Sequence, residues 1–275
     1  MDDKSQAIKN IFDHLWVDYT ILNPNVQRIH DLIASQQEKV VNDHIAFRTF
    51  GLDGIRVEDL AHFFLELGYT YGGDYHFKEK KLKARHLDAP RPDLPKIFIS
   101  ELILEECSAQ LVDTVKAVIS QTEDGYFKTV DYLWKGRPWN PISYQVYDVL
   151  RQESEYAAWM YVFGYRANHF TVSVNQLKQF PDLVSLNAML KQQGITLNAS
   201  GGEIKGGESV YLSQSSTMAD KVAIKFVEGV YSVPSCFYEF ALRHELPSGE
   251  LFSGFVADNA DKIFESTNSQ GALRQ

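Results

Sequence analysis

The chain has 275 residues, of which 44% are apolar and 23% are charged, a globular composition with enough length to bury a sizeable core. Its 27 lysine and arginine residues against 36 aspartate and glutamate residues give a net charge of −9, which opposes binding to nucleic acid. The polar, acidic start MDDKSQAIKN, and apolar runs well short of the roughly 20 residues that span a bilayer, predict a cytoplasmic protein without membrane association.

Residues 1–40 are predicted to form two N-terminal helices, because apolar residues recur at helical spacing and the pattern breaks at Asn23-Pro24. A first β-α-β-β-β module is expected over 41–103. Its elements are a strand at HIAFRTF (44–50), a helix at 57–69, and strands at 69–77, 81–87 and 96–104.

Residues 104–164 return to helical periodicity and are predicted to be an inserted helical segment. A second module with a C-terminal tail is expected over 165–275. Its elements are a strand at NHFTVSV (168–174), a helix at 181–194, and strands around 202–207, 209–214, 221–229 and 235–243.

The fold class is therefore predicted to be α+β. Two βαβββ modules are expected to form one curved, mostly antiparallel sheet around a metal site, in a single metalloenzyme unit over 1–275. Aligning the modules places Asn42-Asp43-His44 over Ala167-Asn168-His169, and Ser100-Glu101-Leu102 over Tyr238-Glu239-Phe240.

His44, His169 and Glu239 are the candidate metal ligands. Residues two apart share a face of a strand, so each of these side chains lies opposite an apolar face that is expected to pack on helices. Two imidazoles and one carboxylate are typical of mononuclear sites with open coordination positions. A buried Glu239 needs a compensating cation, although Arg243 or Arg166 could serve in place of a metal.

The chain has two cysteines, Cys107 and Cys236, too few for a disulfide scaffold or a Cys-rich zinc site. Glu101 occupies the position that mirrors Glu239 in the alignment above. As a fourth ligand it would indicate a glyoxalase-type isomerase or lyase. A non-catalytic small-molecule binding module is the other alternative.

Four stretches resemble the 2-oxoadipate dioxygenase/decarboxylase family of the vicinal oxygen chelate superfamily. They are NDHIAFRTF, PKIFISEL, ANHFTVSV, and YEFALR followed by FSGFVADNADKIFEST. The resemblance implies that His44, His169 and Glu239 hold Fe(II). It also implies that Arg48, four residues after the first histidine, is the catalytic and substrate-binding arginine, and that Glu101 is a residue beside the ligands.

The reaction that the resemblance implies converts 2-oxoadipate and O2 into 2-hydroxyglutarate and CO2. The expected partners are a small 2-oxo diacid and O2. A purified sample could carry Zn, Ni or Mn, because a site of this kind also accepts those metals. The sequence leaves the chain length of the oxo acid and the oligomeric state open.

Overall fold

An eight-stranded curved sheet forms the centre of the computed structural model, which describes residues 3–36 and 38–267. Across the sheet the strands run in the order β2-β3-β4-β1-β5-β10-β7-β6. Their bounds are β1 Asn42–Phe50, β2 Thr70–Phe77, β3 Leu82–Asp88, β4 Lys96–Leu102, β5 Ala167–Ser173, β6 Lys205–Gly207, β7 Leu212–Ser216 and β10 Phe237–Arg243.

The sheet consists of two halves with the same strand arrangement. In each half the first strand pairs parallel with the last, as β1 does with β4 and β5 with β10, and the other neighbours are antiparallel. The antiparallel pairing of β1 with β5 joins the halves. The predicted α+β fold with two βαβββ modules in a mostly antiparallel sheet is confirmed.

One predicted strand lies outside this sheet. Residues 221–229, expected as a strand of the second module, contribute β8 (Lys221–Phe226), which pairs with β9 (Gly229–Pro234) in a separate hairpin. The hairpin is inserted between β7 and β10. Its alternating exposed and half-buried side chains are those of a two-stranded ribbon with one face against the protein and one in water.

Most helices follow the predicted positions, but residues 257–264, expected within a C-terminal tail, also form a helix. Their bounds are α1 Asp3–Leu22, α2 Pro24–Ala34, α3 Val57–Glu66, α4 Ala109–Ile119, α5 Tyr132–Lys135, α6 Tyr144–Glu153, α7 Glu155–Phe163, α8 Leu183–Gln192 and α9 Ala257–Phe264. No helix in the described part of the chain combines the length and apolar composition needed to cross a membrane. Cys107 and Cys236 are free thiols.

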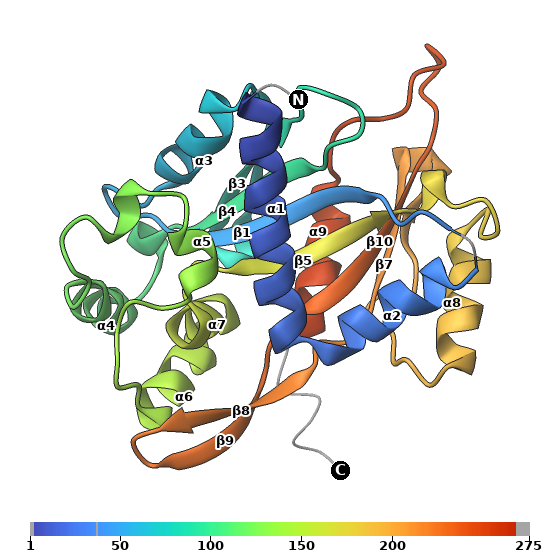
Figure 1. Ribbon diagram of the computed structural model, residues 1–275. Helices are drawn as coiled ribbons and strands as arrows, with labels where there is room; N and C mark the ends of the chain where they lie inside the picture. The colour runs from blue at the N-terminus through green and yellow to red at the C-terminus, as the bar shows by residue number, and fades with distance from the viewer. Residues whose placement is uncertain (1–2, 37, 268–275) are drawn as a thin grey trace.

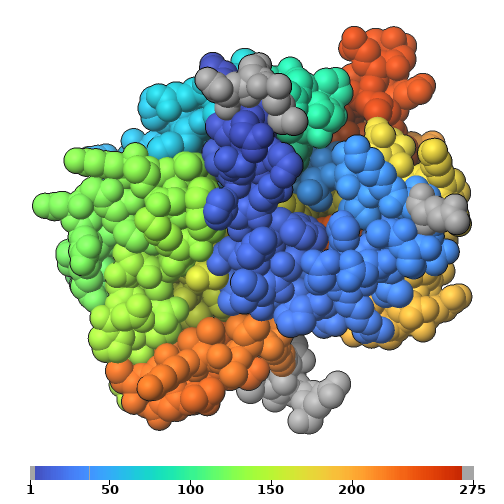
Figure 2. Space-filling view, viewed as in Figure 1, coloured from blue at the N-terminus to red at the C-terminus, as the bar shows by residue number. Residues whose placement is uncertain are grey.

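Helices cover both faces of the sheet. Figure 1 shows α1 in front of the central strands and α9, in red, behind them. On the front face, Phe170 of β5 lies 4.8 Å from Tyr19 and 5.2 Å from Trp16, measured between ring centroids. In the space-filling view, α1 and α2 cover this face and the helical segment, in green, packs beside α1 (Figure 2). The apolar face of the strands is therefore the one that packs against the N-terminal helices.

The corner between α1 and α2 holds the start of β10 in place. Asn23 is fully buried there, and its Oδ1 accepts hydrogen bonds from Cys236 N (2.9 Å) and Ser235 Oγ (2.6 Å). Its Nδ2 donates to Tyr19 O at 2.7 Å. The corner side chain thus anchors the residues that lead into the strand that carries Glu239.

Replacing Asn23 with alanine should lower the free energy of unfolding by about 1 to 3 kcal/mol, because it leaves the buried backbone N–H of Cys236 without its acceptor. Urea unfolding measures this loss. Asn10→Ala is a matched control, since Asn10 is exposed on α1 and its side-chain oxygen accepts from Gln6, which is also exposed. It should change stability by less than about 0.5 kcal/mol. Equal losses for the two variants would contradict the anchoring role of Asn23.

Candidate metal centre

Three buried side chains from three adjacent strands converge on the face of the sheet opposite α1. His44 lies on β1, His169 on β5 and Glu239 on β10, with exposed fractions of 2%, 5% and 1%. One nitrogen or oxygen from each residue lies within 4.8 Å of the others. His169 Nε2 is 3.2 Å from Glu239 Oε2, and His44 Nε2 is 3.7 Å from Glu239 Oε1. The three predicted ligands are thus brought together, in an arrangement that could hold one metal ion.

Strand register produces this convergence. The antiparallel pairing places His169 opposite Ala46, near His44, and the parallel pairing places Glu239 opposite Thr171, two residues beyond His169. Residues two apart share a face, so Glu239 comes to lie on the histidine face. The strand order β1-β5-β10 alone makes neighbours of residues that are up to 195 positions apart.

Both imidazoles are oriented in the way that metal binding requires. His44 Nδ1 lies 2.8 Å from Asp43 Oδ1, and His169 Nδ1 lies 3.0 Å from Asn168 Oδ1. A carboxylate or amide oxygen can only accept, so Nδ1 carries the proton and donates it in both cases. The Nε2 lone pair of each ring therefore faces the Glu239 side of the cluster, where that of His44 accepts a hydrogen bond from Thr171 Oγ1 at 3.0 Å that a bound cation would replace.

The electrostatics of the cluster also suit a cation. Burial alone would raise the pKa of the Glu239 carboxyl, but positive charge on the neighbouring His44 and His169 rings and a hydrogen bond from Gln214 Nε2 to Oε1 (2.6 Å) outweigh it and keep that pKa below its usual value. A cation bound beside the carboxylate would favour its ionised form in the same way. Burial also lowers the pKa of His169, despite the neighbouring carboxylate. An ionised carboxylate beside an uncharged imidazole is the protonation state that binds a divalent metal.

This donor set fits a mononuclear transition-metal site. Two histidine nitrogens and one carboxylate oxygen on one side of an ion leave its remaining positions open to small molecules, as in non-haem iron oxygenases. Three side chains on paired strands could hold such an ion without a large rearrangement.

Arg48 lies on the same strand as His44 and is 2% exposed. Its guanidinium carbon lies 4.9 Å from the ring centroids of both Tyr156 and Trp159, which belong to α7, and 5.8 Å from that of Phe264. Burial lowers the pKa of Arg48 to about 10, so it stays charged at neutral pH. Within the described residues, Nε and Nη1 have no hydrogen-bond partner. The arginine borders a cavity of about 250 Å³.

Glu101 is not part of the cluster. In the parallel pairs His44 lies opposite Lys96 and His169 opposite Phe237, so the counterpart of Glu239 is Phe98, two residues after Lys96. The alignment of Glu101 with Glu239 was therefore three residues out of register. An odd shift moves a side chain to the other face of the strand.

On that other face, the Glu101 carboxylate has its own partners. Oε2 accepts from Val57 N (2.8 Å) at the start of α3, and Oε1 lies 2.9 Å from Lys83 Nζ and 3.6 Å from Arg56 Nη1. These contacts give Glu101 a role in anchoring α3. The arrangement does not support a fourth ligand or a glyoxalase-type site built on it.

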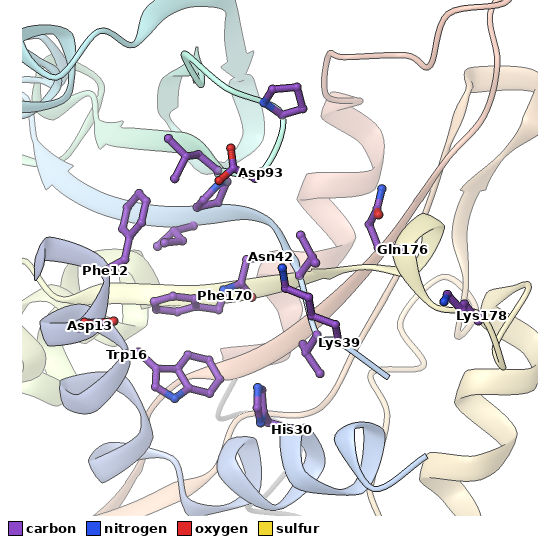
Figure 3. A pocket seen from close by; sticks show the side chains of 16 residues that line it. Phe12, Asp13, Trp16, His30, Lys39, Asn42, Asp93, Phe170, Gln176 and Lys178 are labelled. Carbon is purple, nitrogen blue, oxygen red and sulfur yellow. The ribbon is translucent and has the colours of Figure 1, made fainter. Parts of the chain in front are cut away.

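A larger cavity, of about 800 Å³, lies on the reverse side of the sheet. Figure 3 shows Phe12 and Trp16 of α1 and His30 of α2 around Phe170. Its floor is formed by Ile45 and Phe170, whose side chains point away from the neighbouring ligand histidines. The larger of these two cavities thus lies on the face of the sheet opposite the three candidate ligands.

Sequence reasoning missed the residues that orient the ligands. Arg243, considered as a partner for Glu239, instead pairs with Asp43, with its Nε 2.7 Å from Oδ2. Arg166 pairs with Asp18 at 2.6 Å. A signal was present, because a residue with a side-chain oxygen precedes the histidine in both modules, as Asp43 and Asn168.

The chain matches the family model described as 2-oxoadipate dioxygenase/decarboxylase over residues 10–250. A chloroplastic protein of that name from Arabidopsis thaliana is 34% identical, over 97% of this chain and 79% of the relative. The crystal structure of a rice (Oryza sativa) hydroxyglutarate synthase in complex with 2-oxoadipate is 33% identical. It covers 100% of this chain and 96% of that one, with a TM-score of 0.94.

A crystal structure from Shewanella frigidimarina, described only as a candidate hydrolase, is 44% identical. It covers 91% of this chain and 98% of that one, with a TM-score of 0.87.

Glu239→Gln should weaken divalent metal binding by more than about 100-fold, because it removes the only anionic donor, whereas losing an outer partner already costs about 10- to 100-fold. Glu101→Gln should leave the affinity unchanged. Competition with a chromophoric chelator for Zn²⁺ measures both dissociation constants. Equal losses in the two variants would mean that Glu101 does contribute to the site.

Proposed function

This chain belongs to the 2-oxoadipate dioxygenase/decarboxylase family, and we propose that it is an Fe(II)-dependent enzyme that oxidatively decarboxylates 2-oxoadipate. The balanced reaction is 2-oxoadipate plus O2 to 2-hydroxyglutarate plus CO2. The observation that carries this proposal is the buried group of His44, His169 and Glu239 with one donor atom from each facing a common point. The rice relative solved with 2-oxoadipate supports the choice of substrate.

Iron is proposed because this donor set is the one that non-haem Fe(II) oxygenases use. Bound Fe(II) would supply open coordination positions for the oxo acid and O2, and the reducing capacity that O2 activation needs. The chain itself contributes three neighbouring donors that are 5% exposed or less. Such burial keeps bulk water away from the reacting groups.

Arg48 is proposed to bind the carboxylate at the far end of the substrate. It is a buried cation with unused donors, and it lies beside a cavity that the aromatic rings of Tyr156 and Phe264 help to line. A guanidinium recognises a carboxylate through two parallel hydrogen bonds. The aromatic contacts keep the guanidinium plane in position, so little conformational freedom is lost on binding.

The expected location of the protein is also a proposal. We expect the cytoplasm, whereas the Arabidopsis relative is named as chloroplastic. The cytoplasmic assignment therefore stays a prediction for this chain.

Protein loaded anaerobically with Fe(II) and then given 2-oxoadipate and air should consume O2 and release CO2 and 2-hydroxyglutarate in a 1:1:1 ratio. An oxygen electrode and chromatography of the products measure this. Samples loaded with Zn²⁺ are the matched control and should be inactive. Iron-loaded protein that neither takes up O2 nor forms 2-hydroxyglutarate would rule out 2-oxoadipate as the substrate.

Arg48→Met should reduce the preference for 2-oxoadipate over the monoacid 2-oxohexanoate by roughly ten- to a hundredfold in kcat/KM. A hydrogen-bonded pair with a charged partner is worth about 1.5 to 3 kcal/mol, and only the diacid can form it. Measuring kcat/KM for both substrates with both proteins isolates the contribution of the pair between Arg48 and the far carboxylate. An unchanged ratio would remove Arg48 from the substrate site, even if overall activity fell. Diacids of four to seven carbons then test the distance between metal and arginine.

A further inference from the structure

We propose that Arg243 is a positioning residue that couples the orientation of His44 to the covering of the metal centre by residues 252–255. These four residues, which lead into α9, are called the C-terminal strap below. The inference rests on the metal centre of the proposed function but not on the identity of the substrate.

Two nitrogens of the Arg243 guanidinium bind Asp43, the residue that orients His44. Arg243 is 7% exposed at the end of β10. Its Nε donates to Asp43 Oδ2 at 2.7 Å and its Nη2 donates to Asp43 Oδ1 at 2.8 Å. Asp43 Oδ1 in turn accepts the Nδ1 proton of His44 at 2.8 Å. A bidentate pair of this kind fixes both the position and the plane of the carboxylate, and hence the rotation of the His44 ring.

The third nitrogen of the same guanidinium donates hydrogen bonds to backbone carbonyls of the C-terminal strap. Nη1 donates to Phe252 O at 2.9 Å and to Gly254 O at 2.8 Å. The next residue, Phe255, places its ring edge-on to His44, with centroids 4.8 Å apart, and 5.2 Å from the Arg243 guanidinium carbon. Its backbone N donates to Tyr75 Oη at 3.1 Å. Arg243 is therefore bonded to the His44 support and to the segment that covers His44 at once.

The second module provides an internal comparison. Asn168 supports His169 from the equivalent position with a neutral amide oxygen. Within the described residues, its Nδ2 has no hydrogen-bond partner, so this support has no counterpart of Arg243. The two histidines therefore have different partners. His44 is oriented by an anionic carboxylate that is linked to the strap, whereas His169 is oriented by a neutral amide that is not.

This difference has a thermodynamic consequence. A fixed anionic partner raises the basicity of a ligating imidazole and favours one ring orientation. Because Arg243 holds Asp43 and the strap together, metal binding at His44 and docking of the strap should stabilise each other, and the coupling must be equal in both directions. No such coupling is expected between His169 and the strap.

Hydrogen exchange with and without saturating Zn²⁺ tests the coupling directly. In the unaltered protein, Zn²⁺ should slow exchange of the amides of residues 252–257. Arg243→Lys keeps the positive charge but lacks the planar guanidinium that donates to Asp43 and to the strap at once. In this variant, Zn²⁺ affinity should fall about 10-fold. The metal should then no longer slow exchange in the strap, even when saturation is verified by metal analysis.

Asn168→Ala is the matched control. It should also weaken Zn²⁺ binding, but at saturation the metal should still protect the strap. Strap protection that persists in Arg243→Lys, or that is lost equally in both variants, would overturn the proposal. Neither outcome bears on 2-oxoadipate turnover, so the proposed function is tested separately.

Phe255→Ala extends the test to a change outside the Asp43 contact, in case substitution of Arg243 prevents folding. Phe255 is neither a metal ligand nor a partner of Asp43, yet its removal should loosen the strap and weaken Zn²⁺ binding several-fold. An unchanged Zn²⁺ affinity together with faster exchange in the strap would show that strap and ligand are independent.

Discussion

The buried negative charge of Glu239 is the constraint on which the rest of this structure depends. A carboxylate that is 1% exposed is costly unless a cation or several donors compensate for it. The chain surrounds it with two imidazoles and an amide, yet the Nδ1 protons of both rings are directed away, toward Asp43 and Asn168. A positive ion between the three groups would complete the arrangement, and it would explain why so polar a cluster occupies the middle of a sheet.

The two halves of the sheet contribute unequally to this centre. Each supplies a histidine near the start of its first strand, but only the second supplies a carboxylate from its last strand. At the matching position the first half has Phe98, whose ring packs 4.9 Å from that of Phe255. The first module thus provides an apolar ring that packs against Phe255 at the position where the second module provides the candidate ligand Glu239. A metal held here would therefore have three protein ligands instead of four, with positions left open for reactants.

Segments outside the modules complete the region around the candidate metal centre. Helix α7, from the inserted segment, supplies the rings of Tyr156 and Trp159 that hold the Arg48 guanidinium. The C-terminal strap and α9 cover the same face, and Arg243 joins the strap to Asp43. The modules thus form the donor set, while the additions to them shape what can reach it.

Much of this protein was determined by its sequence alone. Hydrophobic periodicity specified the modules and the helices before α9, because a strand or an amphipathic helix shows its buried face in its own spacing. The polar face of each key strand also singled out His44, His169 and Glu239. The local pattern did not predict that residues 221–229 lie outside the main sheet. Alternation predicts a strand but not which strand will pair with it.

Tertiary structure decided what depends on register between distant strands. Glu101 and Glu239 occupy similar places in similar strands, and a shift of three residues puts them on opposite faces of the sheet. The pairing of Arg243 with Asp43 is likewise invisible in the chain, since 200 residues separate them. The physical reason is that side-chain direction along a strand is a local property, whereas the partner a side chain meets is set by hydrogen bonds between strands remote in sequence.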